Sequence, residues 1–214
     1  MIPQGSWRHV VLWGGFSLGV WILEFMYQYF VLTPGMVGDA LVSSFALGGA
    51  TVIGLALFSS ALFKWYPRLA QYWRVRRYLG VGGFTLIVGH VISVVAYVYD
   101  FQYADIYWSF NPLQNPVIFG SIAFTILFLM ASTSTDWAKQ KLTPRRWKFL
   151  HRFVYGAYVS AIFHFTLMDF RLLKNPAGYF LLAVTAAALF GQLYWFFVTA
   201  ARRRFRSVGT VVGF

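Results

Sequence analysis

The chain has no cysteine among its 214 residues. This absence excludes disulfides, iron–sulfur clusters, thiolate catalysis and covalently attached c-type heme. Charged residues are also scarce, at 11%, whereas hydrophobic residues make up 59% and the mean hydropathy is +0.61. A soluble domain of this length does not have such a composition. Any redox chemistry must therefore belong to a bound cofactor that needs no thiolate.

Long apolar segments take up most of the chain. A helix needs about 20 apolar residues to cross a bilayer. Windows of that length predict transmembrane helices at residues 7–31, 39–63, 78–99, 116–135, 147–169 and 178–200. The first segment is long for a signal peptide and lacks a small-residue cleavage site, so we expect a permanent helix. We expect an all-α membrane protein with a single six-helix domain over residues 1–214.

The distribution of charge predicts the orientation of this bundle. If the N-terminus is cytoplasmic, sixteen of the eighteen basic residues fall on the cytoplasmic side: Arg8, Lys64, Arg68, Arg74, Arg76, Arg77, Lys139, Lys141, Arg145, Arg146, Lys148, Arg152, Arg202, Arg203, Arg204 and Arg206. This asymmetry predicts that both termini are cytoplasmic. The net charge of +12 then indicates anionic lipids as partners, not nucleic acid. Docking of a cytosolic redox partner or of a flavin phosphate such as that of FMN is the alternative.

Four histidines stand out in this apolar sequence. With a rise of about 1.5 Å per residue, His90 and His164 lie at similar depth in the outer half of the membrane. His151 lies about one turn inside the cytoplasmic face, near the depth of His9. On an ideal helix, His151 and His164 point about 140° apart. A histidine inside a span either bonds to a neighbouring helix or serves function, and two at matched depth favour shared ligation of a metal.

The side chains available as ligands limit which metal site could form. A closed tetrahedral zinc site needs about four ligands, and Glu24 is the only acid well within a predicted span. Two axial imidazoles on a heme iron fit better. Gly82, Gly83, Gly89 and Gly156 would let a flat macrocycle approach the helices. Close helix packing is an equally common reason for such glycines.

A second heme is less well supplied with ligands. Arg76 and Arg77 occupy the position on the third predicted helix that matches His151 in depth. His151 could ligate an inner heme with His9 or with a non-histidine group, ligate it alone, or form hydrogen bonds, structurally or near a flavin. Arg77 and Arg152 are placed to pair with the propionates of such a heme. Snorkelling of both arginines to lipid headgroups predicts the same pattern.

Two segments carry a family resemblance: "RVRRYLGVGGFTLIVGHV" and "TSTDWAKQKLTPRRWKFLHRFVYGAYVSAIFHF". They resemble the ferric-reductase-like transmembrane family, and within it the YedZ/MsrQ group of bacterial heme-binding subunits of the periplasmic methionine sulfoxide reductase system. The resemblance implies that His90, His151 and His164 are heme ligands. The fourth ligand of the wider family, on the inner part of the third helix, is absent from this sequence, which leaves the second heme open.

The resemblance also implies a function. It implies a b-type cytochrome that takes electrons from a cytosolic flavin reductase or from quinol and passes them to a periplasmic molybdopterin-containing reductase. The chain would then be an electron-transfer subunit, not the catalytic one. A stand-alone ferric or quinone reductase is the alternative within the same class. A proton-coupled transporter or channel with a histidine relay is the alternative of another class, and the scarcity of buried carboxylates disfavours it.

Overall fold

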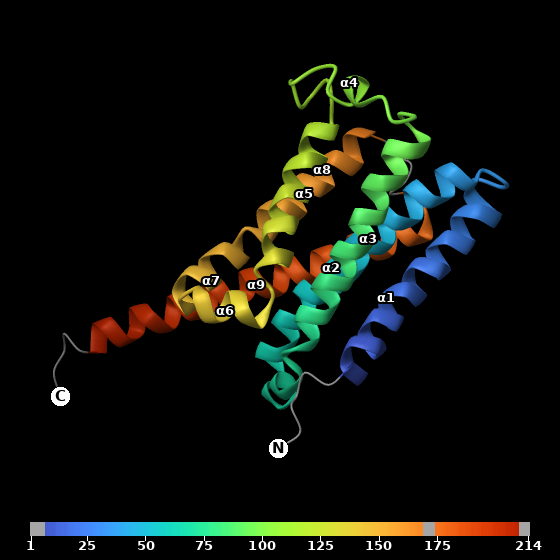
Figure 1. The fold of residues 1–214 in the computed structure, drawn as a ribbon. Coiled ribbons are helices and arrows are strands. Elements are labelled where there is room, and N and C mark those ends of the chain that lie inside the picture. The colour runs from blue at the N-terminus through green and yellow to red at the C-terminus, as the bar shows by residue number, and fades with distance from the viewer. Residues whose placement is uncertain (1–6, 169–173, 210–214) are drawn as a thin grey trace.

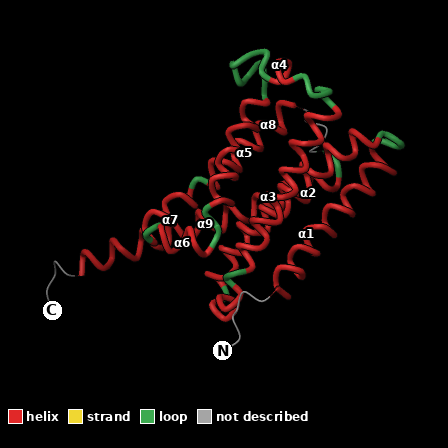
Figure 2. Tube along the Cα trace, in the orientation of Figure 1, coloured by secondary structure: helices red, strands yellow, loops and turns green. Residues whose placement is uncertain are grey.

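The computed structural model of the protein describes residues 7–168 and 174–209. Within these two ranges the secondary structure is helical, with turns between the helices and no strand (Figures 1 and 2). The end of the predicted helix over 147–169 and Arg171 lie outside the described residues.

Most of the predicted apolar segments become one helix each. The long helices are α1 (Trp7–Tyr27), α2 (Val37–Trp65), α3 (Val75–Tyr97), α5 (Val117–Ser132), α8 (Val154–Met168) and α9 (Pro176–Gly209). Short elements join them: η1 (Gln28–Leu32), a π-helical turn that continues α1, the 3₁₀ helix η2 (Pro67–Tyr72), α4 (Tyr103–Ile106), α6 (Asp136–Lys141) and α7 (Pro144–Arg152).

Four of these helices are long and apolar enough to cross a membrane: α1 with η1, α2, α3, and α9 over Pro176–Thr199. α5 is apolar but has 16 residues, and the described part of α8 has 15. The helices therefore agree with a multi-pass membrane protein. The number of six spans stays a prediction.

The predicted continuous helix over 147–169 is wrong in one respect, because it is broken at Phe153. The backbone N–H of Phe153 donates to Leu150 O, three residues earlier, and a new helix starts at Val154. The segment before the break is basic and the segment after it is apolar. The break places His151 in the last turn of α7, outside α8.

Helix α2 forms the centre of the bundle, in contact with α1, α3 and α9 (Figure 1). Its small residues let its neighbours approach closely. A Cβ atom on Gly49 would lie 2.7 Å from Ile87 of α3, and one on Gly54 would lie 2.5 Å from the Tyr158 hydroxyl of α8. Tyr158 donates to Ala50 O at 3.1 Å and so connects α8 to α2.

The two ends of the bundle differ in charge. The connection from 100 to 116, with α4, lies at one end, and α6 and α7 lie at the other (Figure 1). Arg77 at the start of α3 forms a salt bridge of 2.5 Å with Asp136 of α6, and His9 of α1 stacks on Tyr78. These contacts place the starts of α1, α3 and α6 together. This basic end carries Arg8, Lys64, Arg68, Arg74, Arg76, Arg77, Arg145, Arg146, Lys148 and Arg152.

A histidine pair as the candidate functional site

The structure brings His90 and His164 together. Their ring centroids lie 6.4 Å apart, with an angle of 68° between the ring planes. His90 belongs to α3 and His164 to α8, and both are partly buried. Two titratable side chains 74 residues apart in the chain therefore meet between apolar helices.

Backbone carbonyls of two other helices hold the two rings. His90 Nδ1 lies 3.0 Å from Val42 O of α2, and His164 Nδ1 lies 3.0 Å from Pro116 O, which precedes α5. A carbonyl oxygen only accepts hydrogen bonds, so each Nδ1 must carry the proton and donate it. Nε2 is then the ring nitrogen with a lone pair. A histidine that ligates a metal usually donates its other N–H to a carbonyl in this way.

The spacing of the rings fits a shared metal. An ion bound by two opposed imidazoles through bonds of about 2 Å holds the ring centroids roughly 6 Å apart. The observed separation is 6.4 Å. Among the described residues, no group of three or more His, Cys, Asp or Glu side chains gathers where it could hold a metal. The pair thus supplies two imidazoles, which is the number of protein ligands that a bis-histidine heme needs.

Gly120 makes room for one of the two imidazoles. A Cβ atom at this position would lie 3.1 Å from His164 Nδ1 and 3.2 Å from the Cε1 atom of the same ring. The ring therefore lies against the backbone of α5, and its bond to Pro116 O depends on that close approach. Sequence reasoning missed Gly120. A glycine four residues after Pro116, in the first turn of an apolar helix, is the signal that could have indicated it.

The loop before α5 fixes the carbonyl that holds His164. Asn115 is 2% exposed, and its side-chain amide donates to Ile106 O at 2.8 Å and to Ser109 O at 3.2 Å. Its Oδ1 accepts from the Val117 N–H at 3.2 Å. Asn115 therefore satisfies backbone groups on both sides of Pro116 and holds the connection from 100 to 116 against the start of α5.

The other two histidines lie away from this pair. His151 stacks on Trp147 with ring centroids 3.9 Å apart, and its Nδ1 donates to Trp147 O at 3.1 Å. His9 stacks on Tyr78 with a centroid distance of 6.2 Å. Both belong to the basic end. The bond from Nδ1 gives His151 the same tautomer as His90 and His164.

The two arginines predicted to pair with propionates are also at the basic end. Arg77 forms the salt bridge with Asp136, and Arg152 is an exposed residue at the end of α7. Arg76, next to Arg77, interacts electrostatically with Lys64 and with Tyr155 of α8. Several cations therefore surround the start of α8 on the side of His151.

The glycines of α3 serve helix packing. A Cβ atom on Gly83 would lie 2.6 Å from Ile53, and one on Gly89 would lie 2.6 Å from the Phe45 ring, both of α2. A Cβ atom on Gly82 would lie closer still to the Ser17 hydroxyl of α1. For these three positions, close packing is the reason for glycine. Gly156 of α8, by contrast, has nothing within 4 Å of an added Cβ atom.

The sequence matches a known family over this part of the bundle. The family described as "Ferric reductase like transmembrane component" matches residues 46–162, more than half of the chain. The chain belongs to this family. The matched residues include His90 and His151 and end two residues before His164.

Curated relatives agree with the resemblance to the YedZ/MsrQ group. Three of them carry the name "Protein-methionine-sulfoxide reductase heme-binding subunit MsrQ". The protein from Polaromonas naphthalenivorans is 32% identical over 140 residues, 64% of this chain and 61% of the relative. The protein from Rhodospirillum rubrum is 30% identical over 58% of this chain and 61% of its own length. The protein from Klebsiella pneumoniae is 29% identical over 87% of this chain and 92% of its own length. The matches thus span about three fifths of the first two relatives.

Proposed function

We propose that the chain is the b-type cytochrome subunit of a bacterial inner-membrane electron-transfer system, with six membrane spans in one domain and cytoplasmic termini. The gathering of basic residues at one end of the bundle supports this orientation, because cytoplasmic loops carry an excess of Lys and Arg. The basic end would then face the cytoplasm. The end with α4 would face the periplasm.

The His90–His164 pair carries the proposal. Both Nδ1 atoms donate to backbone carbonyls, and the rings are spaced as two axial ligands of one iron would be. The two imidazoles would hold one heme b, which supplies one-electron transfer when bound. Ligands on both faces leave no iron position open, so substrate chemistry on that iron is disfavoured. The residues of this chain fix the ring orientation and exclude water.

A cytosolic flavin reductase would approach the basic end, whereas quinol would reach the bundle from within the membrane. The names of the relatives place them in a methionine sulfoxide reductase system. By analogy, electrons would come from a cytosolic flavin reductase or from quinol and would leave at the α4 end to a periplasmic molybdopterin-containing methionine sulfoxide reductase. His151, Arg77 and Arg152, which all belong to the basic end, would serve a second heme or an FMN there.

Colour and activity test this proposal. Protein purified from heme-replete cells should show the spectrum of a reduced b-type heme, and a colourless preparation would contradict the cytochrome assignment. Co-expression with the periplasmic molybdoenzyme should restore methionine sulfoxide reduction in cells that lack their own membrane subunit. Reoxidation of the reduced protein by ferric chelates, with no gain of methionine sulfoxide reduction, would instead identify a stand-alone ferric reductase.

A further inference from the structure

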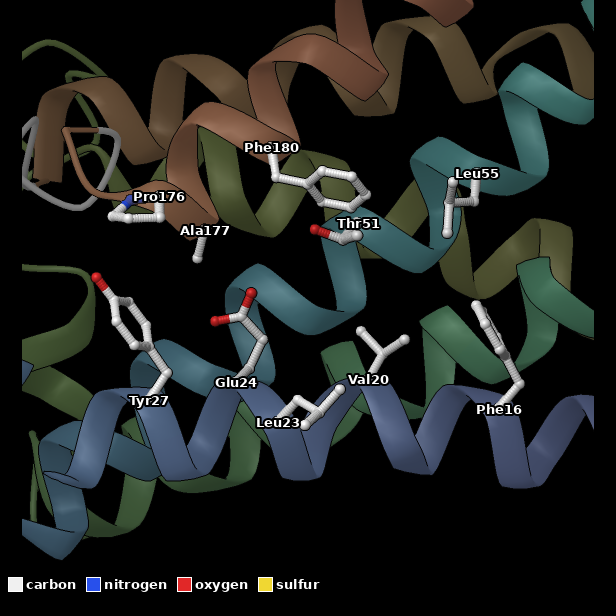
Figure 3. A pocket seen from close by; sticks show the side chains of 10 residues that line it. All are labelled: Phe16, Val20, Leu23, Glu24, Tyr27, Thr51, Leu55, Pro176, Ala177 and Phe180. Atoms are coloured by element: carbon white, nitrogen blue, oxygen red, sulfur yellow. The ribbon is translucent and has the colours of Figure 1, made fainter. Parts of the chain in front are cut away.

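A cavity of about 330 Å³ opens between α1 and α9, with α2 as its floor (Figure 3). Its walls are mainly apolar and aromatic: Phe16, Val20, Leu23, Tyr27, Leu55 and Phe180. None of its lining residues belongs to α3, α5 or α8, so it is separate from the histidine pair. Its volume lies at the lower end of the range typical of small-molecule pockets.

Two polar side chains enter this apolar space. Figure 3 shows the Glu24 carboxyl and the Thr51 hydroxyl directed into the space between α1 and α9. Glu24 Oε2 and Thr51 Oγ1 are buried, and neither makes a hydrogen bond to any described residue. Thr51 is 2% exposed. Unpaired polar groups are costly in a membrane, and ionisable residues inside spans usually mark a substrate or proton pathway.

The side chains that line the cavity determine which kind of ligand can bind there. An acyl chain offers no hydrogen bond to either oxygen. An anionic headgroup would be repelled by the Glu24 carboxylate, and no basic side chain lines the cavity among the described residues. The ligand must be uncharged, lipid-soluble and flat enough for aromatic walls, and it must carry hydroxyl donors. We propose that the cavity binds the ring of a lipid-soluble quinol, with one ring hydroxyl donating to Glu24 and with Thr51 as the second hydrogen-bonding partner. This inference rests on the proposed function, because it locates one of the two donors named there.

A short path of aromatic contacts leads from the cavity to the histidine pair. Trp21 lies three residues before Glu24 on α1 and stacks on Phe45 of α2, with ring centroids 4.7 Å apart. The Phe45 ring in turn packs against Gly89, the residue before His90. Two stacked rings thus connect α1 to the helix that carries His90. Along α2, Thr51 lies about 14 Å from Val42, whose carbonyl holds His90.

Oxidation of the quinol needs an acceptor for its protons and an acceptor for its electrons. Conversion of a quinol to its quinone breaks two O–H bonds and releases two protons and two electrons. The Glu24 carboxylate accepts the first proton and the second is released to water. The heme that His90 and His164 would hold would supply one-electron transfer, so the two electrons would leave the quinol one at a time and pass to the acceptor.

Binding of short-chain quinols tests the assignment. The full chain in quinone-free nanodiscs is titrated with a soluble benzoquinol and with a soluble naphthoquinol, and the Kd is measured by calorimetry. Glu24→Gln and Thr51→Val, which keep the side-chain shape, should each weaken binding of the preferred quinol by about tenfold, because each removes one hydrogen bond to a buried group. Thr125→Val is the matched control, since Thr125 is an exposed residue of α5 outside the cavity. Its Kd should stay within about twofold of wild type.

Separate readouts distinguish failure of this inference from failure of the proposed function. Heme content and reduction by dithionite report on the cytochrome alone and should be the same in all four proteins. Wild-type binding in both cavity variants would overturn the quinol site even if the heme is intact. Competition by phosphatidylethanolamine that also depends on Glu24 would identify a lipid headgroup site and would likewise overturn it. A heme-free protein that binds quinol would contradict the proposed function and leave the site standing.

Discussion

His90 and His164 donate hydrogen bonds from Nδ1 to helices other than the ones that carry them, to Val42 O of α2 and to Pro116 O before α5. Neither imidazole is therefore oriented by its own helix alone. The geometry of the pair depends on how closely α3 packs on α2 and α8 packs on α5. Changes at those two contacts should alter the cofactor site without touching a ligand.

Loss of either member of the pair should abolish the principal heme signal. His90→Ala or His164→Ala removes one of two imidazoles, and the remaining one cannot hold a six-coordinate iron on both faces. Heme stoichiometry and the reduced-minus-oxidised spectrum measure the effect. His9→Ala serves as the control, because His9 is an exposed residue that stacks on Tyr78 away from the pair. Full heme content in His164→Ala would disprove the ligand assignment.

Substitution of His151 should have a smaller effect. His151 lies on α7 and is anchored to Trp147, so His151→Ala leaves the 6.4 Å pair in place. We expect this variant to retain the principal heme and to lose at most a second one. Heme stoichiometry per chain, compared between wild type and variant, gives the answer directly. Loss of all heme in this variant, in spite of normal membrane insertion, would contradict the assignment of the principal heme to His90 and His164 alone.

Gly120→Val should weaken heme binding although it changes no ligand. A Cβ atom there already meets the His164 ring at 3.1 Å, and the branched side chain would push the imidazole away from Pro116 O. Loss of such a supporting hydrogen bond typically lowers metal affinity by about tenfold or more. Gly14→Val is the matched control, since nothing lies within 4 Å of a Cβ atom on Gly14 in the same kind of helix. The measurement is heme retention during dialysis against apomyoglobin. Equal retention in both variants would argue against the role of Gly120.

Variants of the Arg77–Asp136 salt bridge can distinguish two roles of Arg77, the contact with Asp136 and the binding of a heme propionate. Asp136 is well exposed, so the pair should contribute less than about 1 kcal/mol to stability. Asp136→Asn should accordingly leave both the Tm and the heme spectrum almost unchanged. If Arg77 also binds a propionate, Arg77→Gln should shift the midpoint potential of a heme, which Asp136→Asn does not. Potentiometric titration of both variants compares them, and identical potentials would limit Arg77 to its contact with α6.

Hydropathy predicted the helices well because burial in lipid is decided by composition over about 20 residues. The fourth predicted segment, 116–135, ends as helix α5 at Ser132, three residues early, and Ser132, Thr133 and Ser134 donate to carbonyls four residues earlier. The carbonyl partners of His90 and His164 could not be predicted. Every residue has a backbone carbonyl, so no residue type marks the one that a neighbouring helix will present.

The role of each glycine could not be predicted from the sequence either. Sequence alone left packing and cofactor approach as equal explanations for Gly83 and Gly89, because both need only a missing side chain. In the structure both glycines lie against side chains of α2, Gly83 against Ile53 and Gly89 against Phe45, so helix packing explains them. Gly120 was missed because its neighbour, His164, belongs to a helix more than forty residues further along the chain.

The interruption at Phe153 changes the meaning of the thirteen-residue spacing from His151 to His164. In an unbroken helix that number would fix the angle between the two side chains at about 140°. Phe153 keeps helical dihedral angles, but its N–H bonds to Leu150 O, so the angle between the two side chains departs from the ideal value. His151 and His164 therefore belong to two helices, and a substitution at Phe153 can change the orientation of His151 while the hydrogen bond between His164 and Pro116 O is kept.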